Sequence, residues 1–228
     1  MKTYPIFVLI DGKPCLVVGG GAVGERKVQD LLTAGAKVTV VSQALTPTLA
    51  KLASQGQIRY LEGGFTPKHL EGMVLVIGAT DDPRVNARVS AEAQARGIWV
   101  NIADAPELCT FIVPAQVRRG DLTVAISTGG ASPALARRLR EDLERRFGPE
   151  YGPYLALLKE VRERVLAARR GHPDNAALFL RLVDSPLQEA LARHDREEVS
   201  RILVEILEEV LPYAVLAELA DKAVSSEQ

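Results

Sequence analysis

The sequence has little cysteine, little histidine, few aromatic residues and no excess of charge of either sign. Its 228 residues include two cysteines, three histidines and 5% aromatic residues, and 28 Lys and Arg stand against 29 Asp and Glu. Cys15 and Cys109 form no Cys-x-x-Cys pair and the histidines show no ligand spacing, so we expect neither a redox pair nor a protein-held metal site. The net charge of −1 gives no general reason to expect nucleic acid or an anionic membrane as a partner.

Long apolar runs are also missing. The N-terminal apolar stretch, residues 5–10, ends at Asp11 and is too short for a signal sequence or a membrane span. An apolar content of 47% is nonetheless ample for a core, and the length suits one large domain or two smaller ones. We therefore expect an ordinary globular protein, for which a cytoplasmic location is the simplest interpretation.

Glycine, by contrast, is arranged in an informative pattern near the N-terminus. An apolar run from residue 15 leads into Gly19-x-Gly21-x-x-Gly24, and a helical pattern follows. In a dinucleotide-binding βαβ unit the first glycine permits a tight turn, the second lets the backbone approach a pyrophosphate, and the third lets helix and strand pack closely. A second β-rich segment at residues 37–42 stands at the distance that this unit requires. The pattern predicts a dinucleotide site, although a tight turn that binds nothing is the alternative.

The second of these strands ends without the usual acidic residue. A carboxylate there commonly holds the adenosine ribose of NAD, and an arginine accommodates the extra phosphate of NADP. This chain has Ser42 and Gln43 instead. A serine hydroxyl can bond a ribose hydroxyl, and no arginine stands beside it, so we expect NAD rather than NADP.

Strands and helices alternate through residues 1–112, which predicts an α/β fold with a Rossmann-type parallel sheet covered on both faces. Ligands of such sheets bind beyond the carboxyl ends of the strands. One crevice should therefore be lined by the glycine turn, Ser42, residues 78–80 and residues 101–104. The expected strands are 15–19, 37–42, 58–61, 73–79 and 98–103, and the expected helices are 22–34, 46–55 and 83–96.

The pattern changes after this region. Residues 111–117 and 122–127 read as a hairpin, and a second glycine-rich turn then leads into a helix that opens at Ser132. A hairpin and one helix bury little surface alone, so we expect residues 113–148 to be a small α+β dimerisation segment. The remaining residues, 149–228, read as a helical C-terminal domain. On the Ser132 helix, Arg137, Arg138 and Arg140 are either a carboxylate-binding cluster or an exposed face paired with Glu141 and Asp142.

An ordered set of motifs runs along the chain, at residues 19–27, residues 78–82, Asn86, residues 100–104, residues 111–114 and residues 126–133. The set resembles the siroheme synthase N-terminal family, the precorrin-2 dehydrogenases, some of which are also sirohydrochlorin ferrochelatases. The resemblance covers about residues 5–147, and the absence of a uroporphyrinogen methyltransferase domain resembles the stand-alone form.

The resemblance implies an oxidoreductase that converts precorrin-2 to sirohydrochlorin with NAD, as a homodimer whose middle segments interlock. It leaves open whether the chain also inserts Fe²⁺ into sirohydrochlorin, and whether Thr128, where some relatives carry a serine that can be phosphorylated, is modified. The expected cofactor-binding residues are Gly19, Gly21, Ala22, Val23, Gly24, Ser42, Gln43 and Thr80. The expected substrate-binding residues are Asn101, Ser127, Thr128, Gly129, Gly130 and Ser132.

Asp104 matches the family's acidic residue, and the chemistry gives it a role. Removal of a hydride leaves a proton, which a carboxylate at a strand end can take as general base. The alternative is an Asx turn or a cap preceding Pro106. Two other functions remain open: a different NAD-dependent dehydrogenase, against which neither a Tyr-x-x-x-Lys pair nor a zinc-ligand cluster is present, and a non-catalytic NAD-sensing module, for which no DNA-binding output is evident.

Overall fold

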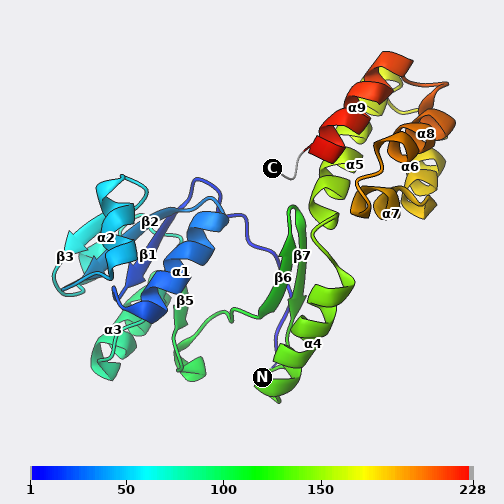
Figure 1. The fold of residues 1–228 in the computed structure, drawn as a ribbon. Coiled ribbons are helices and arrows are strands. Elements are labelled where there is room, and N and C mark those ends of the chain that lie inside the picture. The colour runs from blue at the N-terminus through cyan, green and yellow to red at the C-terminus, as the bar shows by residue number, and fades with distance from the viewer. Residues whose placement is uncertain (1, 226–228) are drawn as a thin grey trace. The chain divides into compact units, whose positions relative to one another are not determined.

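The computed structural model describes residues 2–225, which fold into two compact units (Figure 1). The first unit contains residues 4–113, and the second contains residues 114–225 together with residues 2 and 3. Each unit has its own buried apolar core.

A five-stranded sheet forms the centre of the first unit, with every neighbouring pair of strands parallel. The strand order is β3-β2-β1-β4-β5, which confirms the expected α/β fold with a Rossmann-type sheet. The strands are β1 (Pro14–Val18), β2 (Lys37–Ser42), β3 (Arg59–Glu62), β4 (Leu75–Gly78) and β5 (Trp99–Ile102). The helices are α1 (Ala22–Thr33), α2 (Pro47–Ser54) and α3 (Pro83–Gln94), with short 3₁₀ helices at Pro67–Leu70 and Pro106–Leu108.

Both faces of this sheet are buried, as β1 illustrates. Leu16 and Val18 belong to the core on the side of α3, whereas Cys15 and Val17 belong to the core on the side of α1 and α2. Alternate side chains of a strand point to opposite faces, so a central strand that is apolar throughout requires helices on both sides. Burial raises the pKa of the Cys15 thiol to about 11, which fits a cysteine that serves as a small buried apolar residue.

The chain order in the sheet reverses at β1. From β1 the chain proceeds outward to β2 and β3, then returns to the other side of β1 to form β4 and β5. The loops that leave the carboxyl ends of β1 and β4 therefore run in opposite directions and leave a crevice between them.

The second unit consists of a hairpin, a helix that packs on it and a group of helices (Figure 1). Val117 is its one buried hydrophobic residue between 114 and 153, and the rest of its buried core comes from residues 154–223. The elements are β6 (Ala115–Arg119), β7 (Leu122–Ile126), α4 (Pro133–Arg146), α5 (Tyr151–Ala168), α6 (Asn175–Asp184), α7 (Leu187–Ala192), α8 (Arg196–Leu207) and α9 (Tyr213–Ser225).

The predicted hairpin strand at 111–117 starts too early, because β6 begins at Ala115. The residues just before β6 instead form hydrogen bonds with β5 in the first unit. Thr110 donates its backbone N–H to the carbonyl of Val100 at 2.8 Å, and Asn101 donates its side-chain amide to the carbonyl of Phe111 at 3.0 Å. This segment therefore covers the free edge of β5, where unpaired backbone groups would otherwise be left.

The unit boundary at residues 113 and 114 lies one residue from the predicted end of the first domain. Residues 113–148 and 149–228 were predicted as separate parts, and both fall largely in the second unit. Their division at 148 and 149 stays an interpretation, supported by the position of the buried core.

Candidate functional site

A cleft of about 660 Å³ opens at the carboxyl ends of β1, β2, β3 and β4, within the first unit. This volume lies in the range of ordinary ligand pockets. The cleft is lined by Val18, Gly19, Gly20, Gly21, Ala22, Val23, Val41, Ser42, Gln43, Gly63, Gly64, Phe65, Ala79, Thr80, Asp81, Asp82 and Val85. Of the eight predicted cofactor residues, seven line it, and Gly24 does not.

The three motif glycines differ in what surrounds them. Gly19 has φ +119°, and a Cβ there would lie 2.2 Å from the carbonyl oxygen of Ala79. At Gly24 a Cβ would lie 2.2 Å from the carbonyl oxygen of Gly19. At Gly21 φ is −82° and a Cβ would meet no atom within 4 Å. Gly19 and Gly24 are thus required by the backbone itself, whereas Gly21 leaves open space on the cleft.

Helix α1 begins at the floor of this cleft. Its N-cap is Gly21, and no side chain caps the helix among residues 2–225. The first N–H groups of a helix have no partner within the helix, and its dipole favours negative charge there. Ala22 and Val23 line the cleft, so this helix start is suited to a phosphate group.

Ser42 lines the cleft and also ties the end of β2 to the glycine turn. Its Oγ accepts hydrogen bonds from the backbone N–H of Gly20 at 3.0 Å and of Ala44 at 3.4 Å. The hydroxyl proton remains available as a donor, which is the group that a ribose oxygen requires. Gln43 follows it on the same wall.

The charged residues of the cleft wall are acidic. Among the described residues that line it there is no lysine or arginine, and Asp81 and Asp82 supply carboxylates. Asp82 caps α3 by accepting the backbone N–H of Arg84 at 2.8 Å. Hydrogen bonds from Arg84 lower the pKa of Asp82, so this carboxylate stays ionised.

Asp104 follows β5 at the same edge of the sheet but is not part of the cleft lining. It is exposed and has φ +58°, a left-handed conformation that Asp and Asn tolerate better than most residues. The next 3₁₀ helix has Ala105 as its N-cap and no side-chain cap, which contradicts the alternative that Asp104 caps it. No hydrogen bond or ion pair within residues 2–225 holds the Asp104 carboxylate, so it is free to act on a ligand.

The loop that carries Asp104 is held on both sides. Ala103 donates its backbone N–H to Gly78 at the end of β4, at 2.9 Å. The Cys109 sulfur lies 3.1 Å from the backbone nitrogen of Ile102 and 3.3 Å from the carbonyl oxygen of Ala105. The backbone around Asp104 is therefore fixed although its side chain is free. Asn101 contributes to the same support, because its amide is committed to the carbonyl of Phe111.

The other predicted substrate residues lie in the second unit, in the turn before α4. Thr128 donates its hydroxyl to the carbonyl of Ser132 at 3.2 Å and accepts the Ser132 N–H at 3.1 Å. Ser127 accepts the N–H of Gly129 at 3.1 Å. Ser132 accepts the N–H of Leu135 at 3.2 Å, as the N-cap of α4. The hydroxyl groups of this turn are therefore used as acceptors or donors within the turn.

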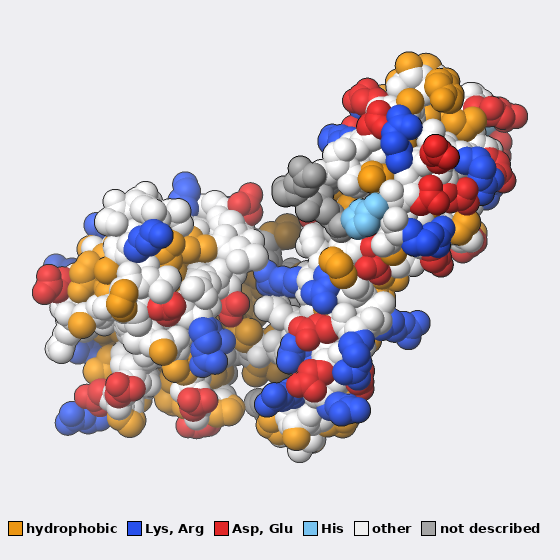
Figure 2. Space-filling view, in the orientation of Figure 1, with side chains coloured by type: hydrophobic (Ala, Val, Ile, Leu, Met, Phe, Trp, Pro, Cys, Tyr) orange, Lys and Arg blue, Asp and Glu red, His pale blue; other side chains and the backbone are white. Residues whose placement is uncertain are grey.

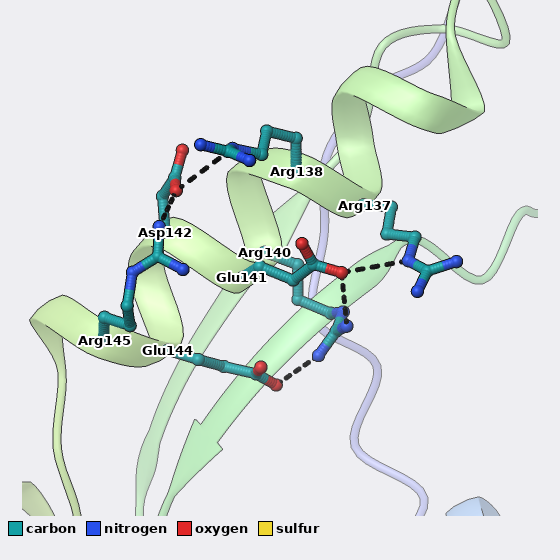
Figure 3. Close-up of polar contacts among 7 residues, drawn as sticks. All are labelled: Arg137, Arg138, Arg140, Glu141, Asp142, Glu144 and Arg145. Carbon is teal, nitrogen blue, oxygen red and sulfur yellow. Dashed lines mark hydrogen bonds and ion pairs between the residues drawn. The ribbon is translucent and has the colours of Figure 1, made fainter.

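The arginines of α4 form ion pairs along the helix (Figure 3). Arg137 contacts Glu141 at 2.9 Å, Arg138 contacts Asp142 at 3.4 Å, and Arg140 contacts Glu144. Of the two interpretations open from the sequence, the structure thus shows the paired face. Basic and acidic side chains also intermingle over the visible surface of the second unit (Figure 2), in keeping with the near-neutral net charge.

Several cleft residues escaped prediction. Gly63, Gly64 and Phe65 line the cleft directly after β3, and Asp81 and Val85 line it beyond β4. Gly63 and Gly64 follow the strand expected at residues 58–61. Because the carboxyl ends of parallel strands meet at one edge of a sheet, this position could have indicated that the two glycines line the cleft.

Two further findings concern metals and membranes. Among residues 2–225, no group of three or more His, Cys, Asp or Glu side chains is arranged to hold a metal ion. The described helices also include none with the length and apolar character to span a bilayer.

The sequence matches two protein families in tandem. Residues 6–115 match a family described as NAD(P)-binding, and residues 119–146 match a family described as sirohaem biosynthesis protein central. The first match contains every residue of the cleft, and the second contains the turn and α4.

Three known proteins illustrate the similarity. The siroheme synthase of Methylobacillus flagellatus is 56% identical over 165 residues, which are 72% of this chain and 35% of that protein. Siroheme synthase 1 of Aeromonas salmonicida is 44% identical over 203 residues, which are 89% of this chain and 43% of that protein. The chain therefore spans less than half the length of these relatives. The solved structure of SirC, a precorrin-2 dehydrogenase, matches with a TM-score of 0.71 and 28% identity, over 88% of this chain and 98% of that one.

Proposed function

Because the chain belongs to the siroheme synthase N-terminal family, we propose that it oxidises precorrin-2 to sirohydrochlorin with NAD as the hydride acceptor. The observation that carries this proposal is the cleft, in which an uncapped helix start, an open glycine and the ends of four strands meet. The reaction removes one hydride and one proton from the macrocycle, so it needs a hydride acceptor and a base.

The residues of the cleft fit NAD. When bound, NAD supplies the site that takes up the hydride. The free N–H groups of Ala22 and Val23 would bind its pyrophosphate, and the open face at Gly21 leaves room for that group. Ser42 and Gln43 would contact the adenosine ribose. No lysine or arginine lines the described cleft beside Ser42 and Gln43, so nothing there would neutralise the extra phosphate of NADP, which favours NAD.

Asp104 would remove the proton. Its carboxylate is exposed, stands beyond the carboxyl end of β5 and has no partner in the described chain. The hydrogen bonds on either side would hold the backbone of Asp104 in place, so that its carboxylate stays beside the bound macrocycle. A base in this position removes the proton that remains once the hydride has left.

The substrate carries eight carboxylates, so its site should offer N–H groups. We assign this role to the turn of residues 127–132, where the N–H groups of Gly129 and Ser132 are used within the turn. The N–H of Gly130, at φ 84°, has no acceptor in the described chain and would be the donor. Asn101 would support the Asp104 loop on the substrate side. Insertion of Fe²⁺ into sirohydrochlorin would use the same Asp104 base to remove ring N–H protons, and Fe²⁺ would enter as a substrate.

We also propose that the protein is located in the cytoplasm.

The replacement Asp104→Asn tests this assignment. Asn keeps the size and tolerates the left-handed backbone, but it cannot accept the proton. We expect the variant to fold and bind NAD normally and to lose about 10²–10⁴ in the rate of precorrin-2 oxidation. Anaerobic turnover assays and calorimetric titration of NAD measure the two quantities.

Glu107→Gln provides the matched control, because Glu107 is exposed in the same loop and the replacement changes the same charge. This variant should keep the parental rate. If Asp104→Asn oxidises precorrin-2 within a few-fold of the parent, Asp104 is not the base.

We also propose that the protein is a homodimer with an interface built from residues 113–148. Helix α4 has no buried residue, and Leu135 and Leu139 on its apolar stripe are 50% and 39% exposed. A second copy of the same segment would cover this stripe through a two-fold interface.

Light scattering tests this assembly. At micromolar concentration the parent should have twice the chain mass of 24.7 kDa, and the double replacement of Leu135 and Leu139 by Asp should have the single mass. Leu180→Asp is the control, because Leu180 is 59% exposed on α6 and lies outside the segment. A parent with the mass of one chain contradicts the dimer.

A further inference from the structure

Asn86 is a buried polar residue next to the cleft that the proposed function does not use. It lies near the start of α3, is 8% exposed and is not part of the cleft lining. A buried amide destabilises the fold unless its polar atoms find partners. Its partners therefore indicate what it does.

All three side-chain hydrogen bonds of Asn86 go to one residue of the cleft, Thr80. The Nδ2 group donates to the Thr80 carbonyl at 2.9 Å, and Oδ1 accepts from the Thr80 backbone N–H at 3.3 Å and from the Thr80 hydroxyl at 2.9 Å. The backbone N–H can only donate and the carbonyl can only accept, so the backbone determines which amide atom is oxygen. Asn86 thus holds Thr80 by its backbone N–H and carbonyl and by its side chain.

These contacts determine what the Thr80 hydroxyl can offer to a ligand. A hydroxyl has one proton. Both groups near it, Oδ1 of Asn86 and the carbonyl of Asp82 at 3.2 Å, are acceptors, so the proton is used within the protein. What remains for the cleft is the lone pairs of the oxygen. Thr80 is therefore held as an acceptor.

The loop that carries Thr80 is also fixed from the side of the glycine turn. Ala79 donates its N–H to the carbonyl of Val18 at 2.8 Å. A Cβ at Gly19 would lie 2.2 Å from the Ala79 carbonyl and 3.2 Å from the Thr80 nitrogen. Thr80 therefore lies between the glycine turn and α3, with little freedom to move.

We propose that Asn86 is a positioning residue that holds Thr80 as the acceptor for the NH₂ group of the nicotinamide carboxamide. The carboxamide has a donor and an acceptor, and an acceptor in the wall selects its donor end, which orients the ring. This inference rests on the proposed function, because it requires that the nicotinamide end of NAD lies at Thr80.

Binding of two dinucleotides tests the inference without turnover. In 3-acetylpyridine adenine dinucleotide an acetyl group replaces the carboxamide, so the shape is kept and the N–H donors are lost. By calorimetric titration, we expect the parent to bind NAD about 3- to 10-fold more tightly than this analogue, the range for one neutral hydrogen bond. Thr80→Val keeps the shape and removes the hydroxyl, and its ratio of affinities should fall to about one.

Asn86→Leu should lower the ratio in the same way, although the new side chain would not touch the ligand. If Asn86 acts through Thr80, the double variant will have a ratio no lower than that of Thr80→Val alone, since coupled residues are not additive. Ser90→Ala is the control on the same helix. Ser90 is 1% exposed and donates to the carbonyl of Leu108 at 2.6 Å, so its loss should lower stability and leave the ratio unchanged.

The outcomes separate this inference from the proposed function. A parent that binds neither dinucleotide overturns both. A parent that prefers NAD, with an Asn86→Leu variant that folds and keeps the parental ratio, overturns the inference alone. If Asn86→Leu does not fold, Thr80→Val decides, because an unchanged ratio in that variant overturns the inference.

Discussion

Two glycine-rich turns, residues 19–21 and residues 128–132, each lead into a helix, but their helix starts differ. Helix α1 begins at Gly21 without a side-chain cap in the described chain, whereas Ser132 caps α4 by accepting the N–H of Leu135. The first turn leaves N–H donors for an anion, and the second satisfies part of its own backbone. A glycine-rich turn before a helix can therefore bind an anion only through the N–H donors that the protein itself leaves unused.

The glycines of the two turns also serve different purposes. Gly129 and Gly130 allow positive φ values, whereas Gly19 additionally permits a close backbone approach to Ala79. Gly21 does neither, since its φ is −82° and the space around its missing Cβ is open. Within the first turn, structural and ligand-related requirements thus fall on different residues.

Gly19→Ala should have the largest effect on stability. The new Cβ would collide with the Ala79 carbonyl, and alanine would be strained at φ +119°. We expect a loss of about 3 kcal/mol or more in the free energy of unfolding, measured by urea denaturation. A loss below about 1 kcal/mol would show that the turn can rearrange, and the distinction between the glycines would fail.

Gly21→Ala should affect binding and leave the fold intact. The added methyl group meets no protein atom but stands where a pyrophosphate would approach, so the charge-assisted hydrogen bonds to the backbone should weaken. We expect NAD to bind about tenfold more weakly or worse, with the free energy of unfolding changed by less than about 1 kcal/mol. Calorimetry measures the affinity for NAD, and urea denaturation measures the free energy of unfolding. An unchanged affinity for NAD would mean that the N–H donors of the first turn do not bind the pyrophosphate.

Ser132→Ala should have the smallest effect and should lower stability without changing the affinity for NAD. Loss of the N-cap hydrogen bond to Leu135 should lower the free energy of unfolding by about 1 kcal/mol, while NAD affinity stays within about twofold. Ser132→Thr keeps an acceptor oxygen and should retain most of the stability. A weakened affinity for NAD in Ser132→Ala would show that this turn takes part in cofactor binding, and the proposed difference between the two turns would be wrong.

The helices and strands of the first unit could be predicted from the sequence because the patterns that indicate them are local. The glycine motif, the strand expected at residues 15–19 and the helix expected from residue 83 each depend on neighbouring residues, and the structure has β1 at Pro14–Val18 and α3 from Pro83. The bounds of the hairpin were less accessible, since Thr110 and Phe111 pair with β5, a contact that only the folded chain creates.

The site shows the same limit more strongly. That Thr80 lines the cleft followed from its place after β4, but the hold that Asn86 exerts on it depends on how α3 packs. The sequence left the two interpretations of Arg137 and Arg138 equally open, because pairing along a helix and binding of a ligand need the same spacing. The sequence therefore predicted the helices and strands themselves, but not the contacts between them.

A single anaerobic assay tests whether the cleft of the first unit serves the NAD-linked oxidation of precorrin-2. The purified protein is mixed with precorrin-2 and NAD in the absence of oxygen, and NADH and sirohydrochlorin are quantified by their absorbance. We expect the two products to form in equal amounts, and Gly21→Ala to slow the formation of both together at limiting NAD. Sirohydrochlorin formed without NADH, or NADH formed from simple hydroxy acids and not from precorrin-2, would contradict it.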